Sequence, residues 1–353
     1  MNAMADIDRL TTDAAWEVST LEEDPSWTFE LTADDIAELR LALAHAKRLG
    51  RKVPDIDTSS FPLPRLSERL RQVRRELVDG RAVVLIRGLP VAEMSKEDAG
   101  TIFWGMGAYL GSAAAQNAFG DVLGHVWDLG KDFKKDTSAR GYQSRLKLSF
   151  HTDATDVVGL LCLRAAKSGG LSSVVSSAAL HNAMLEQRPD LLAVLYQPFT
   201  WDLRGEEPPG HDPYVSLPVF VRHNGRVFCR FIRSYIESAQ RFPEVPRLTE
   251  QQKEALAFME TLAQEERFRC NMEFAPGDMQ FVMNYSVLHS RTAYEDFDDL
   301  DRKRHLLRLW LFLPELSDRP AAYGVRNKVI DSWLRQPRPP IYDVNELMGV
   351  ATH

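Results

Sequence analysis

Two histidines and one aspartate, His151, Asp153 and His289, are the residues that most constrain how this chain folds. Two imidazoles and a carboxylate form the ligand set of a non-heme Fe(II) site that keeps coordination positions open. Side chains alternate between the two faces of a strand, so His151 and Asp153 would point the same way and bind one ion side by side. His289 follows His151 by 138 residues, so the third ligand must come from a distant strand.

With nine histidines in the chain, one His-x-Asp motif is expected by chance. Taken alone, His151-Thr152-Asp153 therefore favours a hydrogen-bonded pair at the surface or in a turn. The segment after His289 favours a site. Arg304 and Arg308 lie four residues apart in a mostly apolar stretch, so on a strand both guanidinium groups would project from one face. A buried arginine needs an anionic partner, and its planar fork matches a carboxylate. Together these residues predict a site that holds an organic acid against iron.

With these segments the chain resembles the TauD/TfdA family of Fe(II)- and 2-oxoglutarate-dependent dioxygenases. The resemblance covers residues from about 80 to 315. The matching segments are His151-Thr152-Asp153, Ser168-Gly169-Gly170-Leu171-Ser172, Pro276-Gly277-Asp278, Leu288-His289-Ser290-Arg291-Thr292 and Arg304 through Arg308.

The resemblance implies a role for each residue of the motifs. His151, Asp153 and His289 match the family's iron ligands. Arg304 matches the arginine that pairs with the distal carboxylate of 2-oxoglutarate, and Arg308 falls where family members often bind an acidic group of the substrate. An alternative for Arg308 is a protein carboxylate or the other carboxylate of 2-oxoglutarate.

One segment departs from the family pattern. Where the family commonly has Gly-Gly-Asp-Thr, this chain has Gly169-Gly170-Leu171-Ser172. Ser172 therefore falls where a threonine hydroxyl usually bonds the distal carboxylate of 2-oxoglutarate, and Ser173 is an alternative donor of that hydroxyl.

By this resemblance we expect a 2-oxoglutarate-dependent dioxygenase that uses Fe(II) and O2. It would couple decarboxylation of 2-oxoglutarate to succinate with hydroxylation, desaturation or cyclisation of a small, carboxylate-bearing molecule. Asp153 argues against chlorination, since related halogenases lack this carboxylate. The alternatives are a hydrolytic metalloenzyme, because zinc also accepts His and Asp, and a non-catalytic metal-binding protein with the same roll.

Charge and composition exclude other classes of partner. The net charge of −7 argues against nucleic acid as a partner. No apolar stretch approaches the roughly 20 residues that span a bilayer, and the first residues lack a basic segment followed by an apolar one. Three widely spaced cysteines fit a reducing compartment. We therefore expect a cytoplasmic protein that binds a small molecule and no membrane; its oligomeric state, including a homo-oligomer, is left open.

Strand patterns dominate the chain after about residue 110, and helical patterns flank them. Helices are expected at 32–49, 66–78, 96–110, 178–188 and 249–263, and strands at 82–86, 146–151, 157–163, 172–176, 199–203, 217–221, 227–232, 268–274, 279–284 and 306–313. This mixture predicts a mixed α/β fold that is mainly antiparallel β, with a double-stranded β-helix (jelly-roll) core and flanking helices.

We expect one domain overall, with three parts. Residues 1–80 would form a helical extension packed on the core, 81–316 the jelly-roll catalytic core with helical insertions, and 317–353 a C-terminal tail. Substrate loops are expected within 113–144 and 205–213. Further pocket candidates are Gln116, Gln143, Lys147 and Asn284.

Overall fold

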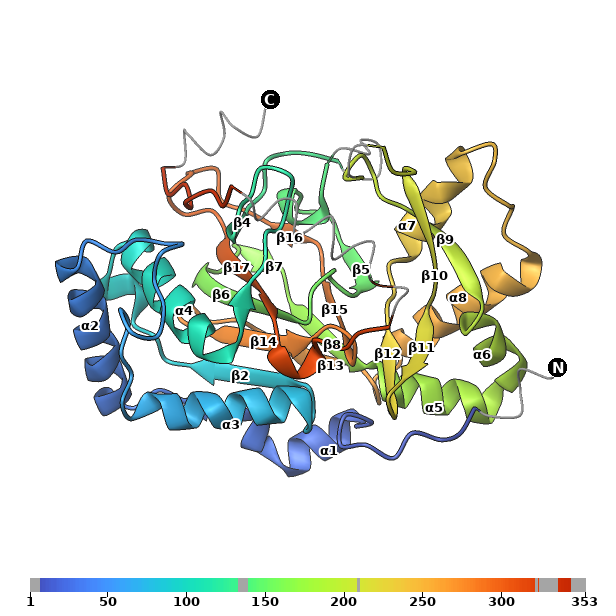
Figure 1. Cartoon of the computed structure of the whole chain (residues 1–353), viewed down its shortest axis with the longest axis horizontal. Coiled ribbons are helices and arrows are strands. Elements are labelled where there is room, and N and C mark those ends of the chain that lie inside the picture. Colours follow the sequence, from blue (N-terminus) through green and yellow to red (C-terminus); the bar gives the residue numbers. More distant parts are fainter. Residues whose placement is uncertain (1–6, 133–138, 208–209, 321–322, 324–335, 344–353) are drawn as a thin grey trace.

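The computed structural model describes residues 7–132, 139–207, 210–320, 323 and 336–343. Two principal sheets occupy the middle of the molecule, and helices lie at both of its ends (Figure 1). All but one of the strand pairings described are antiparallel; the exception joins β1 to β2. The prediction of a mixed fold with mainly antiparallel sheets is confirmed.

The larger sheet has seven strands in the order β1-β2-β14-β6-β17-β3, with β4 also paired to β17. Its central strands β14 and β6 are almost wholly buried, which explains their nearly continuous apolar sequences. The bounds are β1 Thr28–Glu30, β2 Val83–Arg87, β3 Ser112–Ala113, β4 Leu123–Val126, β6 Val157–Arg164, β14 Met279–Met283 and β17 His305–Phe312.

The second principal sheet has four strands in the order β13-β8-β15-β5. Three two-stranded sheets complete the set: β9 with β10, β11 with β12, and β7 with β16. The bounds are β5 Leu148–His151, β7 Ser168–Gly169, β8 Ser172–Ser176, β9 Pro198–Asp202, β10 Tyr214–Pro218, β11 Phe220–His223, β12 Arg226–Cys229, β13 Cys270–Met272, β15 Val287–Arg291 and β16 Tyr294–Glu295.

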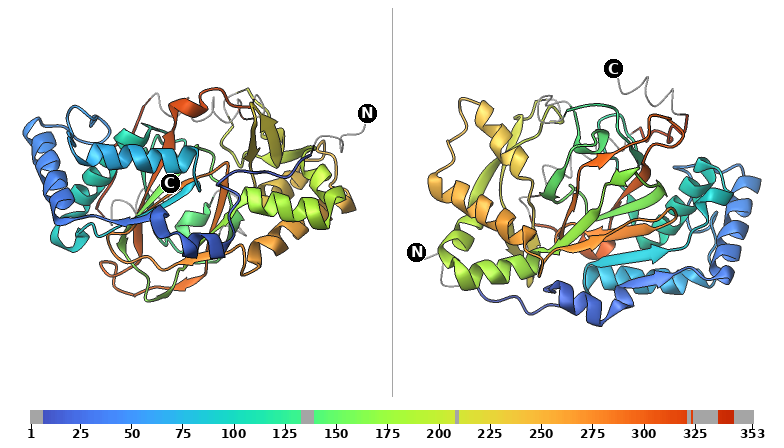
Figure 2. Two further views of the ribbon diagram at one scale, coloured as in Figure 1. Left: turned by 90° about the horizontal axis from the view of Figure 1, so that it is seen from below. Right: turned by 180° about the vertical axis from the view of Figure 1, so that it is seen from behind.

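The helices form two groups (Figures 1 and 2). Helices α2, α3 and α4 lie at the end of the molecule next to β2, and α5 to α8 lie at the opposite end. The bounds are α1 Val18–Glu23, α2 Ala33–Arg48, α3 Leu66–Val78, α4 Lys96–Leu110, α5 Ser177–Gln187, α6 Pro189–Leu195, α7 Arg233–Ser238 and α8 Glu250–Gln264. Among the described residues, no helix combines the length and apolarity that crossing a membrane requires.

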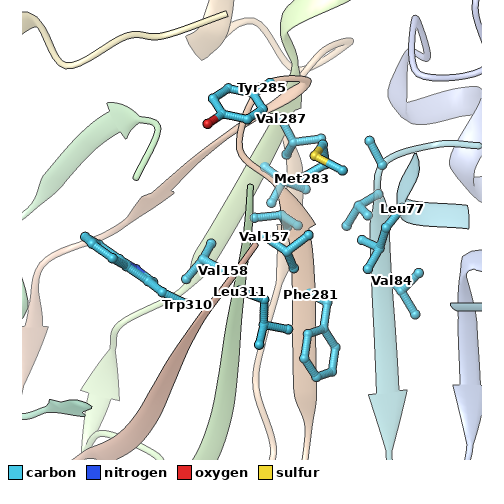
Figure 3. Close-up of a cluster of buried hydrophobic side chains, with 14 of the residues drawn as sticks. Leu77, Val84, Val157, Val158, Phe281, Met283, Tyr285, Val287, Trp310 and Leu311 are labelled. Atoms are coloured by element: carbon cyan, nitrogen blue, oxygen red, sulfur yellow. The ribbon is translucent and has the colours of Figure 1, made fainter. Parts of the chain in front are cut away.

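The strands of the larger sheet separate two sets of buried side chains (Figure 3). Phe281, Val157 and Leu311 lie on one side of the strands, while Val158 and Trp310 lie on the other. Val157 pairs with Leu311 and Val158 with Trp310 across β6 and β17, so alternation along both strands produces this separation. The side that carries Trp310 faces the cavity described below.

Several sequence predictions need correction. The expected strand 217–221 is two strands, because Pro218 ends β10 and has no backbone N–H with which to continue the ladder. The expected strand 227–232 ends at Cys229. Helices α6 and α7 were not predicted. The strand patterns also omitted β15, although the third ligand required a strand at His289.

The predicted N-terminal extension contributes β1, which pairs with β2 in the larger sheet. In the predicted C-terminal tail, Arg338 Nη2 donates to Asp121 Oδ2 at 2.6 Å. Most of the predicted tail, together with 133–138 and 208–209 of the predicted substrate loops, lies outside the described residues.

Candidate metal and organic-acid site

A cavity of about 800 Å³ lies against the inner faces of both principal sheets. Residues of β5, β8 and β15 line it from the smaller sheet, and residues of β6 and β17 line it from the larger one. Residues 139–142 and 230–238 also contribute to its walls. The volume is within the range that small-molecule sites have.

The three predicted metal ligands meet in the wall of this cavity. One ligand atom from each of His151, Asp153 and His289 can be chosen so that all lie within 4.8 Å of one another. His151 and His289 are directly opposed across β5 and β15, and their ring centroids are 4.3 Å apart. The distant strand that the third ligand required is therefore β15, the neighbour of β5.

Asp153 reaches the cluster in a different way from the one predicted. Strand β5 ends at His151, so simple strand alternation does not place the aspartate. Instead, the Asp153 backbone N–H donates to Asn284 Oδ1 at 2.9 Å, and Trp310 Nε1 donates to Asp153 Oδ2 at 2.9 Å. These two bonds hold the backbone and the carboxylate of the residue that follows the strand.

The charges around the cluster favour the forms that bind a cation. Burial alone would raise the pKa of Asp153, but Arg308, His289 and His151 together hold it below its usual value. Burial and the neighbouring His151 lower the pKa of His289 to about 3. An ionised carboxylate and neutral imidazoles are the ligand forms that a metal requires.

The imidazole of His151 is oriented by the backbone. His151 Nδ1 lies 2.9 Å from the carbonyl oxygen of Ser149, so that Nδ1–H donates and Nε2 keeps its lone pair. The donor set fits a non-heme Fe(II) ion, because its two nitrogens and one oxygen leave further coordination positions for other ligands.

Arg304 lies in the same cavity wall, and none of the described carboxylates forms an ion pair with it. The residue is 5% exposed, and its buried Nη1 has no hydrogen-bond partner among the described residues. Its guanidinium carbon lies 5.1 Å from the centre of the Tyr294 ring. Burial is the main cause that lowers its pKa. A desolvated guanidinium is costly unless an anion meets it, so this wall fits the carboxylate of a bound acid.

The two candidate serines lie on opposite faces of β8. Ser172 lines the cavity, whereas Ser173 Oγ donates to Asn271 Oδ1 at 2.7 Å and does not line it. Of the two, Ser172 is the hydroxyl available to a bound molecule. The residue opposite Ser172 on β15 is Arg291, which also lines the cavity.

Arg308 lies on β17 beside the metal-ligand cluster. Arg304 precedes this strand and a register shift falls between His305 and Leu306, so the two arginines do not share one regular strand as predicted, although both line the cavity. Arg308 Nη1 lies 3.5 Å from Asp153 Oδ2, and its Nε donates to Gln116 Oε1 at 2.7 Å. Gln116 also donates from Nε2 to the carbonyl oxygen of Arg308 at 2.7 Å. The structure thus gives Arg308 a protein carboxylate as a partner, while its side chain still lines the cavity.

Sequence reasoning missed three contributors to the site. Trp310 and Arg291 each follow a predicted site residue by two positions on a strand, and this offset is the signal that could have identified them. Helix α7 supplies another wall of the cavity. It is six residues long and follows a short strand, so the sequence carries no comparable signal for it. Of the pocket candidates, Gln116 and Lys147 line the cavity, Asn284 supports Asp153, and Gln143 does not line it.

The two imidazoles and one carboxylate of the cluster form a ligand set that non-heme iron oxygenases use. Comparison with known proteins identifies the family. Residues 46–310 match the family described as taurine catabolism dioxygenase TauD, TfdA family, so the chain belongs to this family of dioxygenases. The predictions of the TauD/TfdA family and of a dioxygenase are confirmed.

Two curated relatives match most of the chain. It is 35% identical to FR-33289 synthase of Streptomyces rubellomurinus over 310 residues, which cover 86% of this chain and 90% of the relative. It is 29% identical to the taurine hydroxylase-like protein SAT17 of Stachybotrys chartarum over 324 residues, covering 88% of this chain and 82% of the relative.

Solved structures share the fold at low identity. An asparagine oxygenase in complex with Fe(II), 2S,3S-3-hydroxyasparagine and succinate has a TM-score of 0.62 at 18% identity, covering 84% of this chain and 98% of that one. The non-heme iron oxygenase OrfP, in complex with Fe, succinate and (3S)-hydroxy-L-Arg, has a TM-score of 0.60 at 15% identity, with 84% and 98% covered.

Proposed function

We propose that this protein is an Fe(II)- and 2-oxoglutarate-dependent oxygenase that oxidises a small acidic molecule. The observation that carries the proposal is one cavity wall. It holds the converging ligand atoms of His151, Asp153 and His289, and the buried guanidinium of Arg304, whose Nη1 has no hydrogen-bond partner among the described residues. His151, Asp153 and His289 would hold iron, and Arg304 with Ser172 would hold the distal carboxylate of 2-oxoglutarate. When bound, iron and 2-oxoglutarate supply the oxidising chemistry by activating O2, with succinate as co-product.

The chain's own residues would position these groups. Trp310 and Asn284 fix Asp153, so that its carboxylate would be held in place as the third protein ligand. Retention of this carboxylate supports hydroxylation, desaturation or cyclisation as the outcome rather than chlorination. A hydrolytic or purely structural metal site is the weaker candidate, because it leaves the buried charge of Arg304 without a role.

The charge of the cavity supports an acidic substrate. Among the described residues that line it, eight arginine and lysine side chains face four carboxylates, although the whole chain carries a net charge of −7. The basic residues are Arg140, Lys147, Arg204, Arg230, Arg233, Arg291, Arg304 and Arg308, and the acids are Asp153, Glu206, Glu237 and Glu260. Fe(II) and the dianion of 2-oxoglutarate cancel each other, so the loaded cavity keeps an excess of positive charge that would attract an anion.

Arg308 is the proposed contact for an acidic group of that substrate, because its Nη1 lies 3.5 Å from Asp153 Oδ2 and its side chain lines the cavity. The names of related proteins agree with a small acid. The asparagine oxygenase and OrfP structures contain hydroxylated amino acids. A uridine-5'-phosphate dioxygenase of an Amycolatopsis species is 30% identical over 150 residues, or 42% of this chain.

We also propose that the two principal sheets form the two halves of a double-stranded β-helix within a single domain. The cavity between their inner faces supports this arrangement, as does the pairing of β1, from the N-terminal extension, with β2.

A screen for substrate-coupled 2-oxoglutarate consumption tests the proposed function. The panel contains amino acids, dicarboxylic acids and phosphate monoesters, each paired with a neutral amide or ester of the same shape. We expect an acid to be oxidised and its neutral counterpart to be rejected. Preferred oxidation of a neutral compound contradicts the proposed substrate class.

The variant Arg308→Ala examines the proposed contact directly. It should lose substrate oxidation while keeping the slow decarboxylation of 2-oxoglutarate that occurs without substrate. Arg226→Ala is the control, since Arg226 lies on β12, outside the cavity, and bonds Asp79. Loss of 2-oxoglutarate binding in the Arg308→Ala variant shows that Arg308 serves the co-substrate instead.

A further inference from the structure

A second buried arginine, Arg291, lies beside Arg304 in the cavity wall. It is the last residue of β15 and stands two positions after His289, so both side chains project from the same face of the strand. It is 5% exposed and lines the cavity. Its neighbour across the sheet is Ser172, the hydroxyl that the proposed function assigns to 2-oxoglutarate.

The guanidinium of Arg291 is only partly satisfied by the protein. Its Nη2 donates to the carbonyl oxygen of Ser144 at 2.7 Å and also to that of Leu146. Its Nε and Nη1 are buried and have no hydrogen-bond partner among the described residues. Both partners that it does have are neutral carbonyls, so these bonds do not neutralise the buried charge.

Arg291 and Arg304 share one aromatic ring. The guanidinium carbon of Arg291 lies 4.7 Å from the centre of the Tyr294 ring, and that of Arg304 lies 5.1 Å from it. Burial, followed by the charge of Arg304, lowers the pKa of Arg291 to about 10, so Arg291 remains a cation at neutral pH. Two buried cations with unpaired N–H groups call for an anion that accepts from both.

We propose that Arg291 is a second co-substrate-binding arginine, which holds the distal carboxylate of 2-oxoglutarate jointly with Arg304. This inference rests on the proposed function and extends it to a residue outside the predicted set. A carboxylate has two oxygens and can accept hydrogen bonds from two guanidinium groups at once. Two residues along a strand span about 7 Å, so His289 and Arg291 are separated by a distance that suits the two ends of a five-carbon diacid.

The same residue connects the co-substrate to the metal ligands. The carbonyl groups of Ser144 and Leu146 that bond Arg291 belong to the segment just before β5, and β5 carries His151. A carboxylate bound to Nε and Nη1 fixes the guanidinium from one side while these carbonyls fix it from the other. Co-substrate binding would therefore steady the strand that supplies the first iron ligand.

The test compares two 2-oxo acids that offer the same keto-acid group to iron. 2-Oxoglutarate has a distal carboxylate, whereas 2-oxopentanoate has a methyl group in its place. Binding of each to the Fe(II)-loaded protein is titrated without O2 through the visible absorption of the iron–keto-acid chelate, so that no turnover is needed. The variants are Arg291→Gln and Arg291→Lys. Glutamine keeps a donor for the carbonyls of Ser144 and Leu146 but removes the charge, and lysine keeps a charge without the fork.

We expect Arg291→Gln to weaken 2-oxoglutarate binding roughly 10- to 100-fold, the size of a lost hydrogen bond to a charged group, with 2-oxopentanoate binding changed less than about twofold. The 2-oxoglutarate affinity of the Arg291→Lys variant should lie between those of the wild type and the Arg291→Gln variant. Arg319→Lys is the matched control, because Arg319 is also a poorly exposed arginine (side chain 14% exposed) but pairs with Asp156 outside the cavity. It should leave the preference for 2-oxoglutarate unchanged.

Two results overturn the assignment of Arg291. If the variants bind both 2-oxo acids equally more weakly than the wild type, the role of Arg291 is purely structural. If both variants bind the two acids as the wild type does, Arg291 makes no contact with the distal carboxylate. If the wild-type protein with Fe(II) binds neither 2-oxo acid, the proposed function fails together with this inference. Thermal unfolding of each variant confirms that the compared proteins are folded.

Discussion

The hydrogen bond from Trp310 to Asp153 joins β17 of the larger sheet to the proposed metal site, beside the contact of Arg308 with the same carboxylate. Trp310 Nε1 donates to Asp153 Oδ2 at 2.9 Å, and the two residues are 4% and 9% exposed. Asp153 lies beyond the end of β5, so this bond, rather than the strand, orients its carboxylate. Trp310→Phe removes the donor and keeps an aromatic ring in the same position.

The expected loss can be estimated in two ways. A hydrogen bond to a charged group contributes about 1.5–3 kcal/mol, and every 1.4 kcal/mol changes an affinity about tenfold. Trp310→Phe should therefore weaken Fe(II) binding by roughly 10- to 100-fold. Loss of a partner that orients a metal ligand commonly weakens metal binding by the same 10- to 100-fold.

The assay is an anaerobic titration of the metal-free protein with Fe(II), together with thermal unfolding to verify the fold. Trp16→Phe is the matched control: Trp16 is 2% exposed, and its Nε1 donates to the carbonyl oxygen of Arg81 at 2.8 Å, outside the cavity. The control should lose stability and keep its iron affinity. An Fe(II) affinity for Trp310→Phe within twofold of the wild type refutes the reasoning.

Three further predictions concern the co-substrate, the core and pH. Arg304→Ala should raise the KM for 2-oxoglutarate by about 100-fold or more, since breaking a buried ion pair costs about 3–5 kcal/mol, and lysine should rescue it in part. The KM is measured from succinate release at increasing 2-oxoglutarate concentration. An unchanged KM contradicts the proposed role of Arg304 in binding 2-oxoglutarate. Gly105→Ala would place a Cβ 2.4 Å from Phe61 Cδ1 and should cost about 1–3 kcal/mol in urea unfolding; a neutral effect would show that Phe61 moves freely. Burial lowers the pKa of His181 to about 4. As the pH drops, the unfolded chain therefore binds the proton first, and the free energy of unfolding falls by about 3 kcal/mol between about pH 6.5 and 4. His181→Gln should flatten this pH dependence in urea unfolding, and the same dependence in the wild type and the variant contradicts the prediction.

The elements with strong local signals were predictable from the sequence. Helix α3 matches its expected span, because Leu66, Leu70, Val73 and Leu77 recur at helical spacing and are all buried. Helix α2 begins where Thr32 provides a cap. The meeting of His151, Asp153 and His289 in one cluster was also predictable, since few functions other than metal binding require this combination.

What the sequence could not supply was long-range register. The roles of Trp310 and Arg291 depend on how β17 pairs with β6 and how β15 pairs with β8. No local pattern specifies these pairings. Asp153 was predicted to join the cluster by strand alternation alone. That reason is incomplete, because its carboxylate is held by a tryptophan 157 residues away.

The most direct test of the central claim is succinate formation from 2-oxoglutarate in air, measured with the purified wild-type protein and with the His289→Ala variant. His223→Ala, on a strand outside the cavity, is the control. We expect Fe(II)-dependent succinate formation by the wild type and the control, and none by the folded His289→Ala variant, which keeps only two metal ligands. Wild-type protein that forms no succinate with any acid of the panel, or a His289→Ala variant that forms it at the wild-type rate, contradicts the assignment of this site.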